Sequence, residues 1–299
     1  MRFRELAEAD LPALLDLCQR TLPYDSFNLP LLRRRVWQEP HHTPAYQITA
    51  WDGDRLAGVM LGGIRETQEG MGAWIRLFAV DVPYRRQGLG SALLAELEGR
   101  LRDAAYKRLR VGNSAPNYLW PGLDVRYTPA FCFLQKHGFE RTGEAVNMLV
   151  DLHARSWDTS ADEERLAAEG FAFRRLTPAD GEEFAAWLTQ RWNPTWLAEG
   201  LSSYANNPIS TFIATYQGRI CAFASYNVAI FDNGFGPTGT EEALRGRGLG
   251  RILFYRCMED MRQLGHATAE VCWVGPIAFY AKVADAWIHR VFWWMEKSL

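Results

Sequence analysis

Apolar residues recur at helical spacing after two glycine-rich stretches of the chain. Two sets of positions share this spacing, namely Leu89, Leu93, Leu97 and Leu101, and Leu249, Leu253, Cys257, Met261 and Leu264. Intervals of three or four residues place each set on one side of a helix, with polar residues on the other sides. The pattern therefore predicts two amphipathic helices, each of which packs one stripe against a core.

Partly alternating, β-rich runs precede both predicted helices. Residues 46–64 (YQITAWDGDRLAGVMLGGI) and 211–230 (TFIATYQGRICAFASYNVAI) each place a glycine turn between two such runs, which is typical of a β-hairpin. A further strand is predicted in residues 72–82 and in residues 234–242, and each runs directly into a glycine-rich stretch. The mixture of hairpins and helices predicts an α/β (α+β mixed sheet) fold with three layers.

The two halves of the chain repeat the same order of features. Residues 1–18 (MRFRELAEADLPALLDLC) align with residues 171–188 (FAFRRLTPADGEEFAAWL) at an offset of 170, and RRQGLG at position 85 has its counterpart RGRGLG at position 245. Matching features in the same order indicate a tandem duplication. At 299 residues the chain is also long enough for about two ordinary domains.

The boundary between the halves is predicted in a polar, acidic stretch that ends in glycine (HARSWDTSADEERLAAEG). We expect a first domain of residues 1–152, a semi-rigid and partly helical connector of residues 153–170, and a second domain of residues 171–299. The last predicted strand (WIHRVFWWM) falls in the second domain, as the counterpart of AVNMLVDL in the first.

Composition argues against several classes of function. The formal net charge of −2 and a pI near 6.3 leave no broad basic field, so we expect no nucleic-acid partner. No window approaches 18 uncharged apolar residues, and the N-terminal MRFRELAEAD has no apolar leader, so we expect no membrane partner and a cytoplasmic location. The five scattered cysteines predict neither a disulfide framework nor a metal site. A monomer or homodimer is expected.

Both glycine-rich stretches place Arg-x-x-Gly-x-Gly between a predicted strand and a predicted helix. The first N–H groups of a helix have no intrahelical partner, and glycine lets the backbone approach a ligand closely. Such a turn suits a phosphate or pyrophosphate, to which arginine adds charge-assisted contacts. The alternative is a tight turn with solvated arginines. A dinucleotide fingerprint is disfavoured because Leu93 and Leu253 stand where its third glycine belongs, and the spacing of a Walker loop is absent from the sequence.

Four segments around these turns carry a family resemblance. Residues 80–98 (VDVPYRRQGLGSALLAELE) and 241–259 (EEALRGRGLGRILFYRCME) surround the turns, and FLQKHGF (133–139) and FYAKVAD (279–285) follow them. The first pair is similar to the acetyl-CoA-binding motif, Gln/Arg-x-x-Gly-x-Gly/Ala, of the GNAT superfamily of acyl-CoA-dependent N-acyltransferases, and the second pair is similar to a later segment of that superfamily. The resemblance implies two tandem GNAT-like domains, each a mixed, mainly antiparallel sheet flanked by helices, with acetyl-CoA as co-substrate and no metal.

The resemblance also implies which residues bind acetyl-CoA. Backbone amides of the glycine-rich loop hold the pyrophosphate, and the preceding strand pairs with the pantetheine arm. The implied residues are Phe78, Ala79, Val80, Arg85, Gln87, Gly88, Leu89, Gly90 and Ser91 in the first half, and Thr238, Gly239, Thr240, Arg245, Arg247, Gly248, Leu249, Gly250 and Arg251 in the second.

A tyrosine that protonates the departing thiolate is a further implication. Its position is Tyr280 in the second half and Leu134 in the first, so we expect the second half to be the active one. A primary amine with a pKa of about 10.4 costs roughly 4 kcal/mol to deprotonate near neutral pH. Glu241 and Glu242 are the candidate bases, with Asp81 as their first-half counterpart. The alternatives are ordinary solvated charge for the carboxylates and a half-buried aromatic for Tyr280.

The first half has 14 more residues than the second between the loop and this position, since 134 − 85 is 49 and 280 − 245 is 35. Several residues of this insert are candidates to line a pocket, to shape an acceptor site or to pack between the domains, namely Asn117, Tyr118, Trp120, Asp124, Arg126 and Tyr127. The resemblance thus implies an N-acetyltransferase that moves an acetyl group from acetyl-CoA to a primary amine of a small molecule or a peptide N-terminus by direct attack. The alternative is a non-catalytic CoA-binding or structural tandem module.

Overall fold

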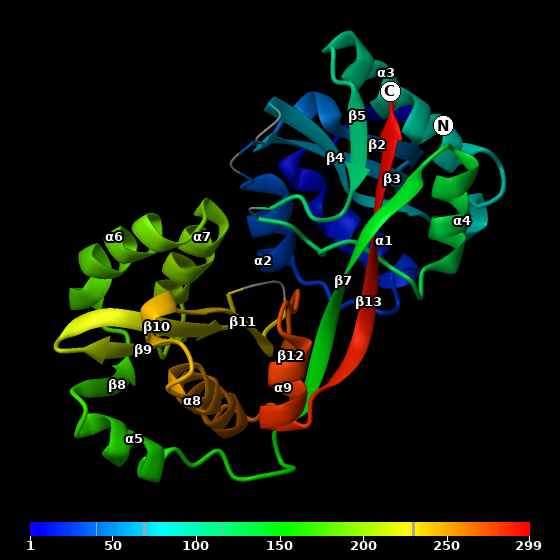
Figure 1. Cartoon of the computed structure of the whole chain (residues 1–299). Helices are drawn as coiled ribbons and strands as arrows, with labels where there is room; N and C mark the ends of the chain where they lie inside the picture. The colour runs from blue at the N-terminus through cyan, green and yellow to red at the C-terminus, as the bar shows by residue number, and fades with distance from the viewer. Residues whose placement is uncertain (40, 68–69, 116, 229–230) are drawn as a thin grey trace. The chain divides into compact units, whose positions relative to one another are not determined.

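The computed structural model describes residues 1–39, 41–67, 70–115, 117–228 and 231–299 (Figure 1). These residues form two compact units, which we call the first unit (Met1–Ala145 and Val291–Leu299) and the second unit (Val146–Arg290). Two segments interpreted from the sequence fall partly outside the described residues, the second hairpin at 229–230 and the insert at 116. In the part of the chain that is described, no helix is both long and apolar enough to cross a membrane.

The first unit is a mixed sheet flanked by helices. Its helices are α1 (Leu11–Thr21), α2 (Leu29–Leu32) with a π-helical continuation (Arg33–Trp37), α3 (Leu89–Asp103) and α4 (Thr128–Lys136). Its strands are β1 (Arg2–Glu5), β2 (Gln47–Asp52), β3 (Arg55–Thr67), β4 (Gly70–Val80), β5 (Arg108–Val111), β6 (Leu123–Asp124), the start of β7 (Glu140–Asp151) and the end of β13 (Trp287–Ser298). Short 3-10 turns lie at Glu8–Asp10, Pro44–Tyr46 and Val82–Tyr84.

The second unit repeats this order of elements. Its helices are α5 (Ser160–Ala167), α6 (Gly181–Arg191), α7 (Pro194–Ser202), α8 (Leu249–Gln263) and α9 (Ile277–Ala284). Besides parts of β7 and β13, its strands are β8 (Phe171–Arg175), β9 (Thr211–Tyr216), β10 (Arg219–Tyr226), β11 (Gly234–Thr240) and β12 (Thr268–Val271). Short 3-10 turns lie at Pro178–Asp180, Ser203–Ala205 and Glu242–Leu244. Helix α5 lies within the stretch predicted as a partly helical connector.

The sheet of the first unit opens at one point beside β4. Its strands follow the order β1-β2-β3-β4-β5-β13, and only β4 and β5 pair in parallel. That parallel pairing ends with Ile75 opposite Val111. On its other side β4 has a β-bulge at Arg76, because Leu61 of β3 pairs with Leu77 and the next residue, Gly62, pairs with Ile75. Residues 77–80 therefore keep one edge free of a strand partner among the described strands.

The sheet of the second unit follows the order β7-β12-β11-β10-β9-β8, and only β11 and β12 pair in parallel. The pairing with β12 ends at Phe235, opposite Val271. The pairing of β11 with β10 is shifted between Phe235 and Thr238, where Pro237 stands. Both sheets are mixed and mainly antiparallel, which confirms the fold class predicted for each half.

The last strand corrects the domain ranges predicted from the sequence. The sequence places all of residues 171–299 in the second domain, whereas the end of β13, from Val291, belongs to the first unit (Figure 1). There Met295 pairs with Val111 of β5, so β5 does not remain an edge strand with unpaired backbone groups. In the second unit β7 takes the corresponding place, with Met148 opposite Val271 of β12. The two halves thus exchange their final strands, a feature that a repeat in the sequence does not reveal.

The helical stripes predicted from the sequence form the two cores. Leu93, Leu97 and Leu101 of α3 are at most 1% exposed, and Cys257 and Met261 of α8 are fully buried. Leu264 departs from its predicted stripe and is 51% exposed, because α8 ends at Gln263.

Candidate functional site

A left-handed glycine joins the end of β4 to helix α3. Gly88 is the N-cap of α3 with a φ of 86°, a conformation that favours glycine, and its counterpart Gly248 before α8 has a φ of 96°. The first three amides of α3, residues 89–91, donate to no described residue. Unbonded N–H groups at a helix N-terminus attract anions. The structure thus places both loops at strand-to-helix junctions, as the sequence predicts.

A cavity of about 830 Å³ lies beside the first loop. The cofactor residues implied by the sequence that line this cavity are Phe78, Ala79, Val80, Arg85, Gly88, Gly90 and Ser91. Gln87 and Leu89 do not line it: the Gln87 side chain donates to the Pro83 carbonyl at 2.7 Å, and Leu89 belongs to the core of the first unit. The cavity continues past Arg76 to Thr21 at the end of α1, and to Trp120, Asp124 and Tyr127 of the insert.

Positive charge gathers at the loop end of this cavity. Arg86, Lys136 and His137 line it together with Arg85, and within the described residues neither arginine nor Lys136 pairs with a carboxylate. The Ser91 hydroxyl lies 2.9 Å from Nε2 of His137. Burial, with the charge of Lys297, lowers the pKa of His137. The sequence alone gives no reason to assign Arg86, Lys136 or His137 to the cofactor, although Lys136 and His137 lie inside the FLQKHGF segment.

The arginines of the second loop are already engaged. Arg247 pairs with Glu169 at 3.0 Å, and Arg251 pairs with Asp162 of α5 at 2.6 Å. Nε of Arg245 donates to the Thr240 carbonyl at 3.3 Å, as Nε of Arg85 donates to the Val80 carbonyl in the first loop at 2.9 Å. The polar stretch predicted as a connector thus supplies carboxylates where the resemblance implies a pyrophosphate.

Strand β11 is partly covered where the resemblance implies the pantetheine arm. A Cβ atom on Gly239 would lie 2.5 Å from Cζ2 of Trp192, so the indole ring lies directly against this strand. Trp192 stacks on Trp196 with ring centroids 4.7 Å apart. At the offset of 170, Trp192 corresponds to Leu22, which lines the cavity of the first unit. The hydroxyl of Thr238 donates to the Phe223 carbonyl at 3.0 Å.

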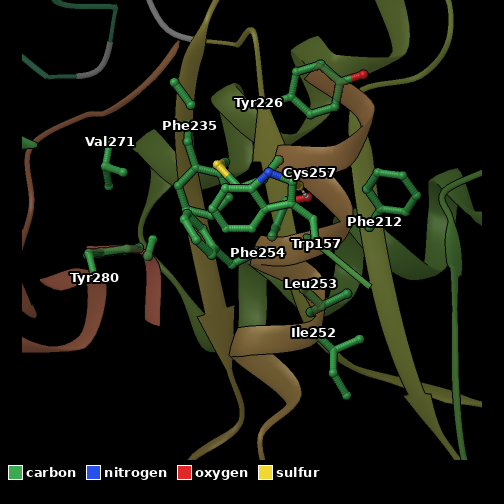
Figure 2. Close-up of a cluster of buried hydrophobic side chains, with 14 of the residues drawn as sticks. Trp157, Phe212, Tyr226, Phe235, Ile252, Leu253, Phe254, Cys257, Val271 and Tyr280 are labelled. Carbon is green, nitrogen blue, oxygen red and sulfur yellow. Dashed lines mark hydrogen bonds between the residues drawn. The ribbon is translucent and has the colours of Figure 1, made fainter. Parts of the chain in front are cut away.

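Tyr280 of helix α9 belongs to the core of the second unit. It is 4% exposed, and its ring contacts Phe235, Phe254 and Phe279. Figure 2 shows it within the same cluster of buried side chains as Phe254 and Cys257. Burial raises the pKa of its hydroxyl. The role of Tyr280 as proton donor stays a prediction.

The carboxylates proposed as bases are held in different ways. Glu241 accepts hydrogen bonds from the Trp187 indole at 2.7 Å and pairs with Arg191 at 3.4 Å, whereas Glu242 is exposed. Asp81 is buried and accepts from Arg55 at 2.6 Å and from the amide of Val82 at 2.8 Å. Burial alone would raise the pKa of Asp81, but hydrogen bonds from Arg55 and Arg20 outweigh it and lower this pKa. Asp81 therefore secures the turn after β4.

A second cavity in the second unit, of about 540 Å³, lies away from its glycine-rich loop. It is lined by residues of the 152–159 stretch, by Phe212 and by the later turns of α8, and neither the loop nor Tyr280 is among the described residues around it. The insert of the first unit, by contrast, contributes Trp120, Asp124 and Tyr127 to the first cavity. One of the three roles open to the insert, lining a pocket, is thus confirmed for these residues.

Comparison with known proteins agrees with this geometry. The model of the acetyltransferase (GNAT) family matches residues 11–118 and 179–284. A search of curated proteins finds no relative. Among solved structures, the chain is similar to a glucosamine N-acetyltransferase region of a fungal multi-domain β-N-acetylglucosaminidase (TM-score 0.78, 18% identity, 99% of this chain and 38% of that one). It is also similar to a tandem GNAT protein from the clavulanic acid biosynthesis pathway (TM-score 0.69, 16% identity, 99% and 98% covered) and to a GCN5-related N-acetyltransferase from Sphaerobacter thermophilus (TM-score 0.67, 15% identity, 99% and 95% covered).

The three likenesses support the fold, and the chain spans less than half of the fungal enzyme. The family model matches each half of the chain once, with one glycine-rich loop inside each match. The protein is therefore a two-domain member of the acetyltransferase (GNAT) family.

Proposed function

We propose that this protein is an N-acetyltransferase that moves an acetyl group from acetyl-CoA to a primary amine of a small molecule or a peptide N-terminus. We also propose that its first unit catalyses this reaction. The observation that carries the proposal is the cavity of about 830 Å³, which connects the first glycine-rich loop with the free edge of β4 and with the insert. Family membership supports acetyl transfer in general.

The residues of this cavity fit acetyl-CoA. The unbonded amides after Gly88 form a cradle for a pyrophosphate, and Arg85, Arg86 and Lys136 add positive charge around it. Beyond Ile75 the edge of β4 is free to pair with the pantetheine arm as an added strand. When bound there, acetyl-CoA supplies the acetyl group as a thioester at the open end of the β4–β5 pair.

The other end of the cavity is where we place the acceptor amine. Thr21 and Trp120 line this end, together with Asp124 and Tyr127. The Tyr127 hydroxyl donates to Asp25 at 2.7 Å and accepts from the amide of Tyr24 at 3.2 Å, so it is held in one orientation. This end of the cavity thus combines polar groups with two aromatic rings.

Tyr127 is the group to which we assign protonation of the departing sulfur, a role that Leu134 cannot perform. Tyr127 caps α4 about two turns before Leu134 and borders the cavity. The amine loses one proton as it forms the amide bond, and the sulfur gains one as the thioester bond breaks, so the reaction needs no other reactant. In the structure the proton of the Tyr127 hydroxyl is directed at Asp25, so the hydroxyl has to turn from Asp25 to the sulfur for the transfer.

The second unit is proposed to be a structural partner without turnover. Its loop arginines pair with Glu169 and Asp162, and Trp192 lies against Gly239. In the alternative, the second unit is the active one and its catalytic residues are Tyr280, Glu241 and Glu242.

The test is release of CoA thiol from acetyl-CoA by the full chain across a panel of primary amines. We expect release with at least one amine, and a loss of about 100-fold in kcat for Tyr127→Phe, since a general acid contributes that much or more. Tyr216→Phe, which removes a hydroxyl outside the cavity, is the control and should keep the rate. No release with any amine would contradict the proposal and would favour a module that only binds CoA.

A further inference from the structure

A buried cluster of charged side chains borders the acceptor end of the first-unit cavity. Glu39 lies between Arg65, at 2.7 Å, and Arg76, at 3.1 Å, and all three side chains are 2% exposed. Asn117 of the insert donates to Glu39 at 2.7 Å and accepts from Arg35 at 2.9 Å. The cluster therefore places two guanidinium groups on one buried carboxylate, and Asn117 links that carboxylate to Arg35.

Arg76 is the member of this cluster that lines the cavity. It is the extra residue at the bulge of β4, and its hydrogen bonds to the carbonyls of Arg35 and Asn117, at 2.6 and 2.8 Å, both leave from Nη2. Its contact with Glu39 also uses Nη2, and its buried Nε has no partner among the described residues. Nη1 and Nε thus keep their hydrogen-bonding capacity while the rest of the side chain is fixed.

The direction of the Arg76 side chain follows from two glycines of β3. A Cβ atom on Gly62 would lie 3.0 Å from Leu97 of α3, whereas a Cβ atom on Gly63 would lie 2.3 Å from Cδ of Arg76. Successive residues of a strand point to opposite faces. Arg76 therefore lies on the face of the sheet away from α3, the same face as the π-helical segment that contains Arg35.

The free N–H groups of Arg76 favour an anion. Burial is the largest influence on Arg76 and lowers its pKa to about 10, and the charges of Arg65 and Arg35 act in the same direction while Glu39 opposes them. A buried cation is costly unless it is paired, and Arg76 shares the Glu39 carboxylate with Arg65. A negative group brought into the cavity would offset that cost.

We infer that the acceptor amine carries an anionic group, a carboxylate or a phosphate, that binds to Arg76 at the wall of the cavity. The inference rests on the proposed function of the first unit and names its class of acceptor. Charge-assisted hydrogen bonds from arginine to either group are short and strong. In the second unit the position at the offset of 160 is Gly236, so that unit has no equivalent of Arg76.

The first experiment uses the unmodified protein and pairs of amines that differ in one charge. One pair is an amino acid and its amide, and the other is an amino sugar phosphate and the free amino sugar. We expect the anionic member of one pair to have a kcat/KM about 10- to 100-fold higher than its neutral partner. A preference in the first pair indicates a carboxylate, and a preference in the second pair indicates a phosphate. Equal or lower values for the anionic member in both pairs would overturn the inference.

The second experiment compares variants on the same pairs. Arg76→Gln should reduce the ratio between anionic and neutral acceptor to about one, and Arg76→Lys should retain part of it. Arg100→Gln, which removes a half-exposed arginine of α3 outside the cavity, is the matched control and should keep the ratio. A purely structural Arg76 would lower the melting temperature in both Arg76 variants and leave the ratio unchanged, which would also overturn the inference.

Failure of the proposed function can be told apart from failure of this inference. If no amine releases thiol, calorimetric titration of the same amine pairs in the presence of CoA still measures acceptor binding. Tighter binding of an anionic member, lost in Arg76→Gln and partly kept in Arg76→Lys, would support the anion site even so. Equal binding of both members would reject it.

Discussion

The two glycine-rich loops have the same backbone geometry and different surroundings. Gly88 and Gly248 are both left-handed N-caps, and Arg85 and Arg245 both donate to a carbonyl at the end of the preceding strand. The first loop opens onto a cavity, whereas carboxylates of the connector pair with Arg247 and Arg251 of the second. The motif thus forms the same strand-to-helix turn in both units. Whether such a turn is open to a ligand depends on the residues that surround it.

The bulges of β4 and β11 also differ between the two units, in the residues that stand at them. In β4 the bulge places Arg76 beside the cavity, and the next residue, Leu77, has a backbone N–H. In β11 the corresponding pair is Gly236 and Pro237, which offers neither a charged side chain nor a second amide hydrogen. The bulge of the first unit therefore carries polar groups beside the cavity, and the bulge of the second unit has no such groups at the corresponding positions.

The largest expected effect separates the two loops directly. Gly88→Asp puts a carboxylate beside the amides that would hold the pyrophosphate, and Gly248→Asp makes the same change at the other loop. Both glycines have a similar positive φ, so the two changes strain the backbone to a similar extent. Like charges in contact cost several kcal/mol, so we expect kcat/KM for acetyl-CoA to fall by about 100-fold or more in Gly88→Asp and by less than about twofold in Gly248→Asp.

Steady-state kinetics with varied acetyl-CoA, together with melting temperatures of both variants, would measure this difference. The reverse pattern, a large loss in Gly248→Asp and little in Gly88→Asp, would show that the second unit carries turnover.

A smaller effect is expected from a methyl group placed against Arg76. Gly63→Ala would bring a Cβ atom within 2.3 Å of Cδ of Arg76, so the arginine has to move. We expect about a tenfold loss of kcat/KM with an anionic acceptor. Gly62→Ala crowds Leu97 and Tyr46 on the other face and is the control. Both variants should lose about 1–3 kcal/mol of stability through overpacking, which chemical denaturation measures. Equal kinetic losses in the two variants would assign the effect to packing alone.

A third prediction concerns an ion pair that the duplication has kept in both units. Arg4 binds Asp10 at 2.5 Å, and Arg174 binds Asp180 at 2.6 Å, so in each unit the first strand is tied to the turn before the first helix. Asp180 also accepts from the hydroxyl of Thr177 at 2.6 Å, where the first unit has Ala7. We expect Asp10→Asn to cost about 1 kcal/mol and Asp180→Asn about 1 kcal/mol more.

The dependence of this contribution on pH follows from the same contacts. Hydrogen bonds from Arg4 and Arg174 lower the pKa values of Asp10 and Asp180. A carboxyl group with a lowered pKa in the folded state stabilises fully above its unfolded pKa, near 4, and loses that contribution as the pH falls. Urea unfolding at pH 7 and pH 3 should therefore show a smaller gap between wild type and variant at pH 3. A gap that is the same at both pH values would contradict this account.

The fold and both loops could be predicted because their signals are local. The spacing of Leu93, Leu97 and Leu101 and the glycines of each loop depend on neighbours a few positions away. That the second loop is covered could not be predicted, because its cover comes from Trp192 lying over Gly239 and from Asp162 reaching Arg251, pairs that are 47 and 89 residues apart (239 − 192 and 251 − 162). Which loop faces a ligand is thus a property of long-range packing.

The exchange of the last strands could not be predicted from the sequence for a related reason. A final strand satisfies any open edge of suitable register, and the pattern of residues 287–298 does not say whether that edge is β5 or β12. The pairing of Met295 with Val111 is visible only in the folded unit. The place of Arg76 beside the cavity could not be predicted for another reason. A single arginine within an apolar strand gives no periodic signal.

The smallest expected effect is the most direct test of the comparison. Tyr280→Phe removes one hydroxyl from the core of the second unit, where the ring packs against Phe235 and Phe254. If the first unit carries turnover, kcat should change by less than about twofold, and stability by less than about 1 kcal/mol, because the aromatic contacts remain. Thiol-release kinetics beside Tyr127→Phe provide the measurement. A loss of about 100-fold in Tyr280→Phe, with Tyr127→Phe unaffected, would return the active site to the second unit, because general acid catalysis at the sulfur would then depend on Tyr280.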